Sequence, residues 1–269
     1  MIRDITLGQY YQTDSVVHRL DPRTKLIATF AYLVSLFLAS NLYVYLAAFI
    51  FLVVAIKACR VPLKFIVRGM KAIVVLLLLT VVLNIFLIDG EPVVTLWKLT
   101  ITREGIRTAV FMALRLTFLI MGSSIMTLTT TPNQLTDALE SVLKPLRVIK
   151  VPVHEIAMMM SIALRFIPIL TEETDKIMKA QLARGADFES GNLIKRVKNM
   201  VPILVPLFIS AFRRANDLAM AMEARCYRGG DGRTKMKPLH YQKRDGLAYL
   251  YLFGYLGLIC VLGFMIPKI

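Results

Sequence analysis

The chain has 269 residues, of which 57% are hydrophobic, and it carries a formal net charge of +15 at pH 7. Soluble domains average about 45–50% apolar residues, so the composition excludes an ordinary soluble protein and indicates a membrane protein with several spans. Lys and Arg collect in the cytoplasmic loops of membrane proteins, and we attribute the positive charge to that cause and not to nucleic-acid binding. Cys59, Cys226 and Cys260 are too far apart to predict a disulfide framework or a metal site.

The first 25 residues are polar and basic, and we predict a cytoplasmic N-terminal segment over 1–25. Asp21-Pro22 is a typical helix start, because Asp caps free backbone N–H groups and Pro suits the first helical position. Arg19, Arg23 and Lys25 stand just before the first apolar run as basic anchors. By the positive-inside rule they place this end of the chain in the cytoplasm.

Residues 26–130 contain four apolar runs that we predict to be transmembrane helices, at 26–40, 42–58, 72–88 and 106–130. The first two are short for a hydrocarbon core of about 30 Å, so we expect tilted spans with a tight turn between them. The loop after the third span has balanced charges, and Trp97 in it is a candidate interfacial anchor. Arg115 lies inside the fourth run, and it is either a functional residue or a packing residue paired within the bundle.

Residues 131–245 differ in character, and we predict that they form a cytoplasmic coupling domain of long amphipathic helices. One helix is expected over 153–184, with an apolar first half and a charged second half, so that it begins beside the membrane and ends in water. Residues 193–200 are basic and amphipathic, which is typical of a segment at an anionic membrane surface. A second long helix is expected over 202–226.

In this second helix Ala211, Ala215 and Ala219 recur at four-residue steps. Such a stripe of small residues favours the close approach of another helix, and we expect it to face residues 153–184, with Arg214 on the opposite side. Residues 246–269 contain a fifth predicted span. The fold class is therefore all-α: a polytopic membrane protein with about five transmembrane helices and a cytoplasmic domain.

Both long helices are expected to end in similar triplets, Ala183-Arg184-Gly185 and Ala224-Arg225-Cys226. Arg has five donors in a rigid planar fork and stays charged when partly buried, so each Arg could dock into a groove on another protein. A cation at a helix C-terminus is also common as a solvated cap, and the residues alone leave both interpretations open. The similarity extends upstream, to Ala180 and Ala221 four residues earlier and to Ile177 and Leu218 seven residues earlier.

The stretch from Ser15 to Lys25, preceded by Gly8-Gln9-Tyr10, resembles the N-terminal signature of one family. That family is the transmembrane T component (EcfT/CbiQ-like) of energy-coupling factor (ECF) transporters, which import vitamins and metals. Its members look like this chain over essentially the whole length, with coupling helices that end in Ala-Arg-Gly-like motifs. Cys226 departs from the pattern, since Gly is more typical there, and the stop of the second helix must then come from Gly229-Gly230.

The resemblance implies a scaffold and energy-coupling subunit in the cell membrane of a prokaryote. Such a subunit links two ATP-binding-cassette ATPase subunits to a separate small membrane protein that captures vitamins or other micronutrients. Arg184 and Arg225, with their flanking triplet residues, would dock the ATPases. The apolar stretch 156–170 would dock the substrate-binding subunit, although its Met residues could equally fill space between helices. The candidate docking residues there are Met158, Met159, Met160, Ile162 and Leu164.

The chain has no Gly-x-x-x-x-Gly-Lys-Ser/Thr loop, so it should not hydrolyse ATP by that chemistry. The resemblance implies a non-catalytic subunit that binds no cofactor, with ATP and Mg²⁺ held by the partner ATPase subunits. Three alternatives remain open. The first is a T component dedicated to cobalt or nickel. The second is a membrane-embedded enzyme with 131–245 as its catalytic part. The third is a self-contained channel or carrier, which would favour repeated broken helices.

Overall fold

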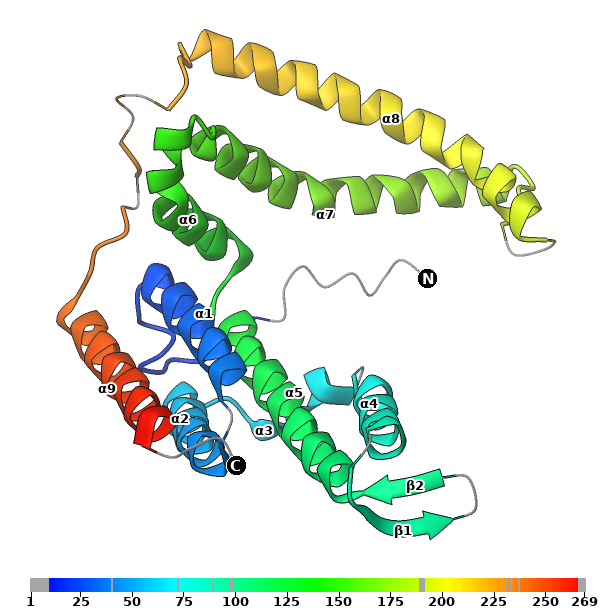
Figure 1. Ribbon diagram of the computed structural model, residues 1–269. Helices are drawn as coiled ribbons and strands as arrows, with labels where there is room; N and C mark the ends of the chain where they lie inside the picture. Colours follow the sequence, from blue (N-terminus) through cyan, green and yellow to red (C-terminus); the bar gives the residue numbers. More distant parts are fainter. Residues whose placement is uncertain are drawn as a thin grey trace. The chain divides into compact units, whose positions relative to one another are not determined.

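The computed structural model describes residues 10–265 except 40, 72, 89, 97–98, 189–191, 231, 233 and 237. The described residues fall into two units (Figure 1). Residues 140–238 form one of them, which we call the long-helix unit. Residues 10–139 together with 239–265 form the other, which we call the bundle unit.

The described part of the bundle unit consists of helices and one short β-hairpin. Its elements are α1 (Pro22–Leu38), α2 (Leu42–Cys59), α3 (Leu63–Lys71), α4 (Val74–Leu87), β1 (Pro92–Leu96), β2 (Leu99–Thr102), α5 (Arg103–Thr129) and α9 (Lys243–Met265). α6 (Pro132–Leu143) passes into the long-helix unit, which continues with the 3₁₀ turn Lys144–Ile149, α7 (Val153–Ala183) and α8 (Leu193–Ala224). The predicted class of a helical polytopic membrane protein is confirmed, and the hairpin is an addition to it.

The predicted spans correspond to α1, α2, α4, α5 and α9, with ends shifted by a few residues. Among the described helices, α2, α5, α7 and α9 are long and apolar enough to cross a membrane. The count rises to five when α3 and α4, bent by 61° where they meet, are taken as one broken span. α1 has 17 residues, which is shorter than the roughly 20 that a straight crossing needs.

Two segments are more regular than the sequence predicted. The loop after the third predicted span forms the antiparallel hairpin β1–β2, in which Val94 pairs with Ile101, while Trp97 lies outside the described residues. Thr102 joins this hairpin to α5: its hydroxyl donates to the Ile88 carbonyl at 2.7 Å and accepts from the Gly105 N–H at 3.1 Å. In the other unit, the predicted surface segment 193–200 and the helix after it are one continuous helix, α8.

An aromatic cluster holds α1 against its neighbours in the bundle unit. Tyr32 of α1 stacks on Phe51 of α2 with 5.5 Å between ring centroids, and Phe51 stacks on Tyr255 of α9 at 4.3 Å. The hydroxyl groups of Ser35 and Tyr255 are 2.8 Å apart and share a hydrogen bond. α5 approaches closely because Gly122 has no side chain: a Cβ there would lie 2.6 Å from the Tyr32 ring. One tyrosine thus contacts three helices.

Arg115 of α5 is paired within the bundle unit, as one of the two interpretations of its sequence position predicted. Its Nε donates to the Tyr45 hydroxyl at 3.1 Å, and its Nη2 donates to the Ala39 carbonyl at 3.2 Å. Ala39 is the C-cap of α1, so the guanidinium lies at the negative end of that helix dipole. The guanidinium also lies 5.9 Å from the centroid of the Phe37 ring. Arg115 therefore joins the end of α1 to α2 and α5.

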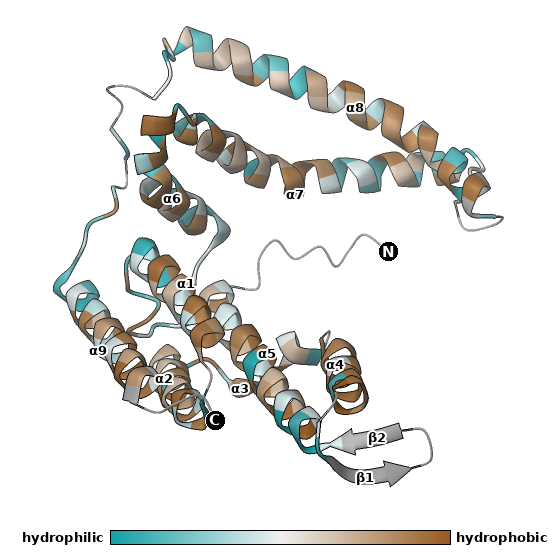
Figure 2. Ribbon diagram, in the orientation of Figure 1, coloured by the Kyte–Doolittle hydropathy of each residue, from teal (hydrophilic) through white to brown (hydrophobic). Residues whose placement is uncertain are grey.

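At one end of the bundle unit, which we call the polar end, the starts of α1 and α9 meet the ends of α2 and α5. Figure 2 shows the hydrophilic starts of α1 and α9 in teal. Asp21 caps α1 by accepting from the Arg23 N–H at 2.9 Å, as predicted. The Asp245 carboxylate accepts from the backbone N–H groups of Asp21 and Gln242, both at 2.8 Å, and Asp245 is only 2% exposed. One carboxylate thus joins the first and last helices of the unit.

Lys25 also joins helix ends at the polar end, from a buried position. It was predicted to be a surface anchor, and this is wrong, because the residue is only 5% exposed. Its Nζ donates to the carbonyls of Thr129 at 2.9 Å and His18 at 3.1 Å, which ties α1 to the last residue of α5. The His18 ring contacts the Ser15 hydroxyl at 2.7 Å and the Tyr11 carbonyl at 3.0 Å. The Ser15–Lys25 stretch is therefore an internal connector of helix ends.

Replacing Asp245 with Ala removes the acceptor for two backbone N–H groups at a buried position. We expect the free energy of unfolding to fall by about 1–3 kcal/mol for each group left without a partner. The measurement is the Tm of the full chain in detergent. Asp217→Ala, at an exposed position on α8, is the matched control and should leave the Tm unchanged. Equal Tm values for the two variants would contradict this role of Asp245.

Candidate docking site at two arginine-bearing helix ends

α7 ends in a Schellman motif that places Arg184 at the C-cap. Gly185 adopts a left-handed conformation with φ +84°, which glycine reaches without steric cost. Its N–H donates to the Leu182 carbonyl, and the N–H of Ala186 donates to the Gln181 carbonyl, both at 3.0 Å. These bonds satisfy carbonyl groups that the last helical turn leaves free.

α8 ends in the same motif, although its triplet has no glycine. Cys226 takes the left-handed conformation itself, with φ +54°. Its N–H donates to the Glu223 carbonyl at 2.9 Å, and the N–H of Tyr227 donates to the Met222 carbonyl at 3.0 Å. The prediction that Gly229-Gly230 must stop this helix is therefore wrong: a non-glycine residue accepts the left-handed conformation, at a cost of about 1–2 kcal/mol.

The two triplets lie at opposite ends of one pair of helices. α7 and α8 run antiparallel, side by side, in Figure 1. Near one end the Gln181 side chain donates to the Pro202 carbonyl at 3.5 Å. Near the other end Gly230 packs on the His154 ring, which a Cβ would approach to 2.3 Å. The triplet at the end of each helix therefore lies beside the start of the other helix. The 31 residues of α7 make the pair about 46 Å long.

The face of α8 that contacts α7 differs from the predicted one. Arg214 donates to the Glu173 carboxylate of α7 at 2.7 Å, so it lies on the contact side and not opposite to it. Ala215 and Ala219 are exposed and only Ala211 is half-buried, so most of the alanine stripe does not line the contact. Arg214 and Leu218, one residue earlier in each of the last two turns, lie on that face instead. The buried and half-buried residues along it are Ile203, Leu207, Ser210, Ala211, Arg214, Leu218 and Met222.

A second cluster fixes the chain that follows the Arg225 triplet. Glu140 of α6 lies 2.8 Å from His154 Nδ1 at the start of α7, and it accepts from Lys235 Nζ at 2.5 Å. Burial acts to raise the pKa of Glu140, but its hydrogen bonds with His154 and Lys235 outweigh burial, and the pKa lies below its ordinary value. The segment after α8 is thus held against the start of α7.

Arg184 and Arg225 have equivalent surroundings. Both residues are exposed, as are the triplet residues Ala183, Gly185, Ala224 and Cys226. Among the described residues neither guanidinium has a hydrogen-bond or ion-pair partner. The upstream positions match as well, since Ala180 and Ala221 are exposed and Ile177 and Leu218 are half-buried. Each helix end thus offers five free N–H donors on a small-residue background to another molecule.

The predicted docking residues of α7 divide into two groups. Met159 and Met160 are exposed, whereas Met158, Ile162 and Leu164 are half-buried. Two of the five therefore face outward within the long-helix unit. The other three are covered in part, which agrees with the alternative that they fill space between helices.

An apolar stripe on α8 was missed. Its residues repeat at three- and four-residue steps, which is the spacing of one helix face, and Figure 2 shows this part of α8 in brown. The spacing predicts this face from the sequence, and the exposed Ala215 and Ala219 continue it at the next three- and four-residue steps. The stripe residues, all between 47% and 64% exposed, are Val201, Leu204, Val205, Phe208, Ile209 and Phe212.

Comparison with known proteins decides the family. The model of the family described as cobalt transport protein (CbiQ) matches residues 13–236. The protein of Clostridium kluyveri called energy-coupling factor transporter transmembrane protein EcfT is 56% identical over 97% of this chain and 96% of its own length. Proteins with the same name are 53% identical in Acidaminococcus fermentans, over 99% of this chain and 100% of theirs, and 47% identical in Bacillus subtilis, over 91% and 93%.

The chain belongs to this family of energy-coupling factor transporter transmembrane proteins. It is therefore a multi-pass membrane protein and the transmembrane, energy-coupling component of an ECF transporter. The relatives carry the general ECF name, which supports the main prediction over a component dedicated to cobalt. As an ECF transmembrane protein, it has two arginine-bearing helix ends for which the contacts within its own described residues give no partner.

The shared Schellman geometry predicts how position 226 tolerates substitution. Cys226→Gly should keep or slightly raise the Tm of the full chain, because glycine adopts φ +54° without strain. Cys226→Val should lower the stability by about 1–2 kcal/mol, because a β-branched residue is disfavoured there. Cys260→Val within α9, also exposed, is the control and should have little effect. A Cys226→Val variant as stable as the Cys260→Val variant would contradict the left-handed stop.

Proposed function

We propose that this chain couples two ATP-binding-cassette ATPase subunits to a separate membrane protein that captures the substrate. The observation that carries the proposal is the pair of matching helix ends, each with an exposed arginine, at opposite ends of one helical pair. Two exposed arginine side chains in equivalent surroundings suit binding to two similar partners. The name of the relatives, which refers to energy coupling, agrees with a role in transmitting motion.

In this proposal Arg184 enters a groove on one ATPase and Arg225 enters a groove on the other. The planar guanidinium suits carbonyl or carboxylate oxygens in such grooves. Ala183, Gly185, Ala224 and Cys226 are small and leave room for a partner to close around each arginine. ATP and Mg²⁺ belong to the ATPases, and this chain supplies no catalytic residue and binds no cofactor.

The substrate-binding subunit docks, in the same proposal, on apolar surface of the long-helix unit. Met159 and Met160 supply exposed apolar area on α7, with Met158, Ile162 and Leu164 behind them, and the stripe Val201–Phe212 supplies more on α8. An exposed apolar patch of this kind typically marks an interaction surface. The captured substrate is a vitamin or another micronutrient.

The polar end of the bundle unit faces the cytoplasm of a prokaryotic cell in the proposed orientation. Arg19, Arg23, Lys57, Arg60 and Arg244 all lie at or near this end. The opposite end, around the start of α5, has Glu104 beside its basic residues. The positive-inside rule therefore puts the N-terminal side of α1 in the cytoplasm. We propose the same side for residues 131–245 because of their own Lys and Arg content.

Arg184→Ala and Arg225→Ala should each weaken the contact with one ATPase, and the double variant should lose both ATPases. Truncating one partner of a buried charge contact costs about 2–5 kcal/mol, so recovery of the ATPases with the tagged chain should fall at least about tenfold. Arg→Lys should also impair assembly, because the planar fork is lost. Normal transport and normal recovery of both ATPases with the double variant would refute the docking proposal.

Arg213→Ala is the matched control for these variants. Arg213 is an exposed arginine on α8, twelve positions before the Arg225 triplet residue, and it has the same charge and side chain. Its removal should leave recovery of the ATPases and transport unchanged. Equal losses in Arg213→Ala and Arg225→Ala would indicate a general effect of charge and contradict the specific role of the helix end.

The purified chain by itself should show no ATPase activity and no tight vitamin binding, because both functions belong to partner subunits. The measurements are phosphate release and equilibrium binding of labelled vitamins in detergent. The reconstituted complex is the positive control, and both signals should appear there. Saturable, high-affinity vitamin binding by the isolated chain would overturn the division of labour proposed here.

A further inference from the structure

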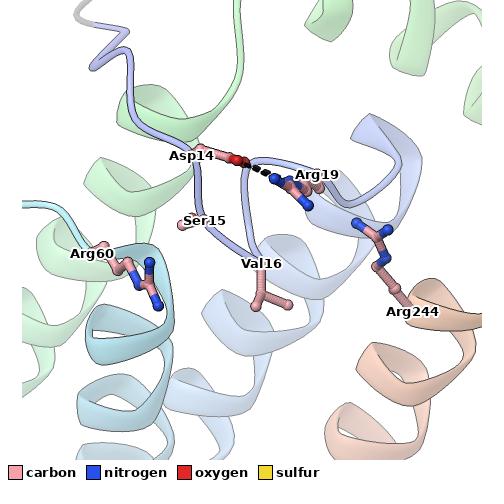
Figure 3. Close-up of a pocket in the computed structure, with 6 residues that line it drawn as sticks. All are labelled: Asp14, Ser15, Val16, Arg19, Arg60 and Arg244. Atoms are coloured by element: carbon pink, nitrogen blue, oxygen red, sulfur yellow. Dashed lines mark hydrogen bonds and ion pairs between the residues drawn. The ribbon is translucent and has the colours of Figure 1, made fainter.

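A basic pocket of about 290 Å³ opens at the polar end of the bundle unit. Figure 3 shows that its lining comes from three segments: the stretch before α1, the residue after α2 and the first turn of α9. The helix-coupling function described above uses none of these residues. They are Asp14, Ser15, Val16, Arg19, Arg60 and Arg244.

The pocket has three guanidinium groups and one carboxylate. Arg19 is paired, since its Nε and Nη2 donate to the Asp14 carboxylate. Among the described residues Arg60 and Arg244 have no hydrogen-bond or ion-pair partner. The hydrogen bond from Arg19 lowers the pKa of Asp14, and the charges of Arg60 and Arg244 act in the same direction. The pocket is therefore positively charged at neutral pH even with Asp14 ionised.

The helix boundaries place this pocket at headgroup depth. Arg60 follows the last residue of α2, and Arg244 lies in the first turn of α9, and both helices are long and apolar enough to cross a membrane. The ends of such helices mark the border between the hydrocarbon core and the headgroups. Val16 in the pocket wall is 63% exposed, and Leu247, three residues after Arg244, is 67% exposed. Apolar surface for acyl chains is thus present beside the charges.

Arg60 takes a left-handed conformation at the end of α2. Arg60 is the C-cap of α2 and adopts φ +54°, with its N–H directed to the Lys57 carbonyl at 3.4 Å. Glycine is the usual residue at a left-handed helix stop because it carries no steric penalty. Arginine at this position accepts that strain and contributes a guanidinium that the turn itself does not require.

We propose that this pocket binds the phosphate of an anionic phospholipid through the guanidinium groups of Arg60 and Arg244 that line it. Guanidinium groups bind phosphate oxygens in a bidentate manner and hold their charge in a partly dry site. Basic pockets between transmembrane helices are suited to acidic lipid headgroups. The proposal depends on the orientation above only for the leaflet, which is the cytoplasmic one if the polar end lies inside.

The test is lipid binding by the full-length chain in detergent, followed by native mass spectrometry. Phosphatidylglycerol is titrated against the native chain, Arg60→Gln/Arg244→Gln, and the control Lys57→Gln/Lys64→Gln. The control removes the same charge from exposed positions near the same helix ends that do not line the pocket. The Tm of each variant shows whether it is folded, and the single variant Arg244→Gln is used if the double variant is not.

We expect the pocket variant to bind phosphatidylglycerol at least tenfold more weakly than the native chain, and the control to stay within about twofold. Equal losses in the two variants would indicate attraction to basic surface in general and overturn the proposal. So would equal binding of phosphatidylcholine by the native chain. Inorganic phosphate that displaces the lipid at similar concentration would identify a soluble-anion site instead. These outcomes do not depend on the ATPases, so the docking proposal stands or fails separately.

Discussion

The bundle unit depends on the buried carboxylate of Asp245. Its two oxygens accept from the backbone N–H groups of Gln242, at the start of α9, and of Asp21, at the start of α1 and 224 positions from Asp245 in the sequence. A buried carboxylate is costly unless such donors surround it, so the two helices are held together by the need to satisfy it. Lys25 ties α1 to α5 in a similar way, because its Nζ donates to the Thr129 carbonyl at the end of α5. The ends of the helices, and not only their apolar sides, therefore determine how the bundle closes.

Helix termination rules determine the candidate docking site in a similar way. Both α7 and α8 close with the same pair of backbone hydrogen bonds, and this places each arginine at an equivalent point on its helix. The equivalence comes from backbone geometry, because Gly185 and Cys226 differ chemically but both take a left-handed conformation. Membership of the ECF transmembrane family agrees with an energy-coupling role for this repeated geometry, and in the proposed function each helix end attaches one ATPase subunit.

The sequence predicted the features that depend on local pattern. Apolar runs, the Asp21 cap and the two arginine triplets were all found, because each is encoded within a few residues. Features that depend on distant pairing were not found. Lys25 is held in a buried position by the carbonyl of Thr129, about a hundred residues later in the chain. The face of α8 that contacts α7 is fixed by the pairing of Arg214 with Glu173. The end of α8 at Cys226 was not predicted, because glycine is the usual residue at a left-handed helix stop.

The antiparallel arrangement of α7 and α8 has a mechanical consequence. The two triplets lie at opposite ends of the α7–α8 pair, so the length of the pair sets the distance between the partners that bind them. The described contacts between the two helices include the Arg214–Glu173 ion pair, the Gln181–Pro202 hydrogen bond and the buried side chain of Ile203. A displacement imposed on one triplet is therefore carried along the helix pair to the other, because these contacts join two continuous helices at more than one point.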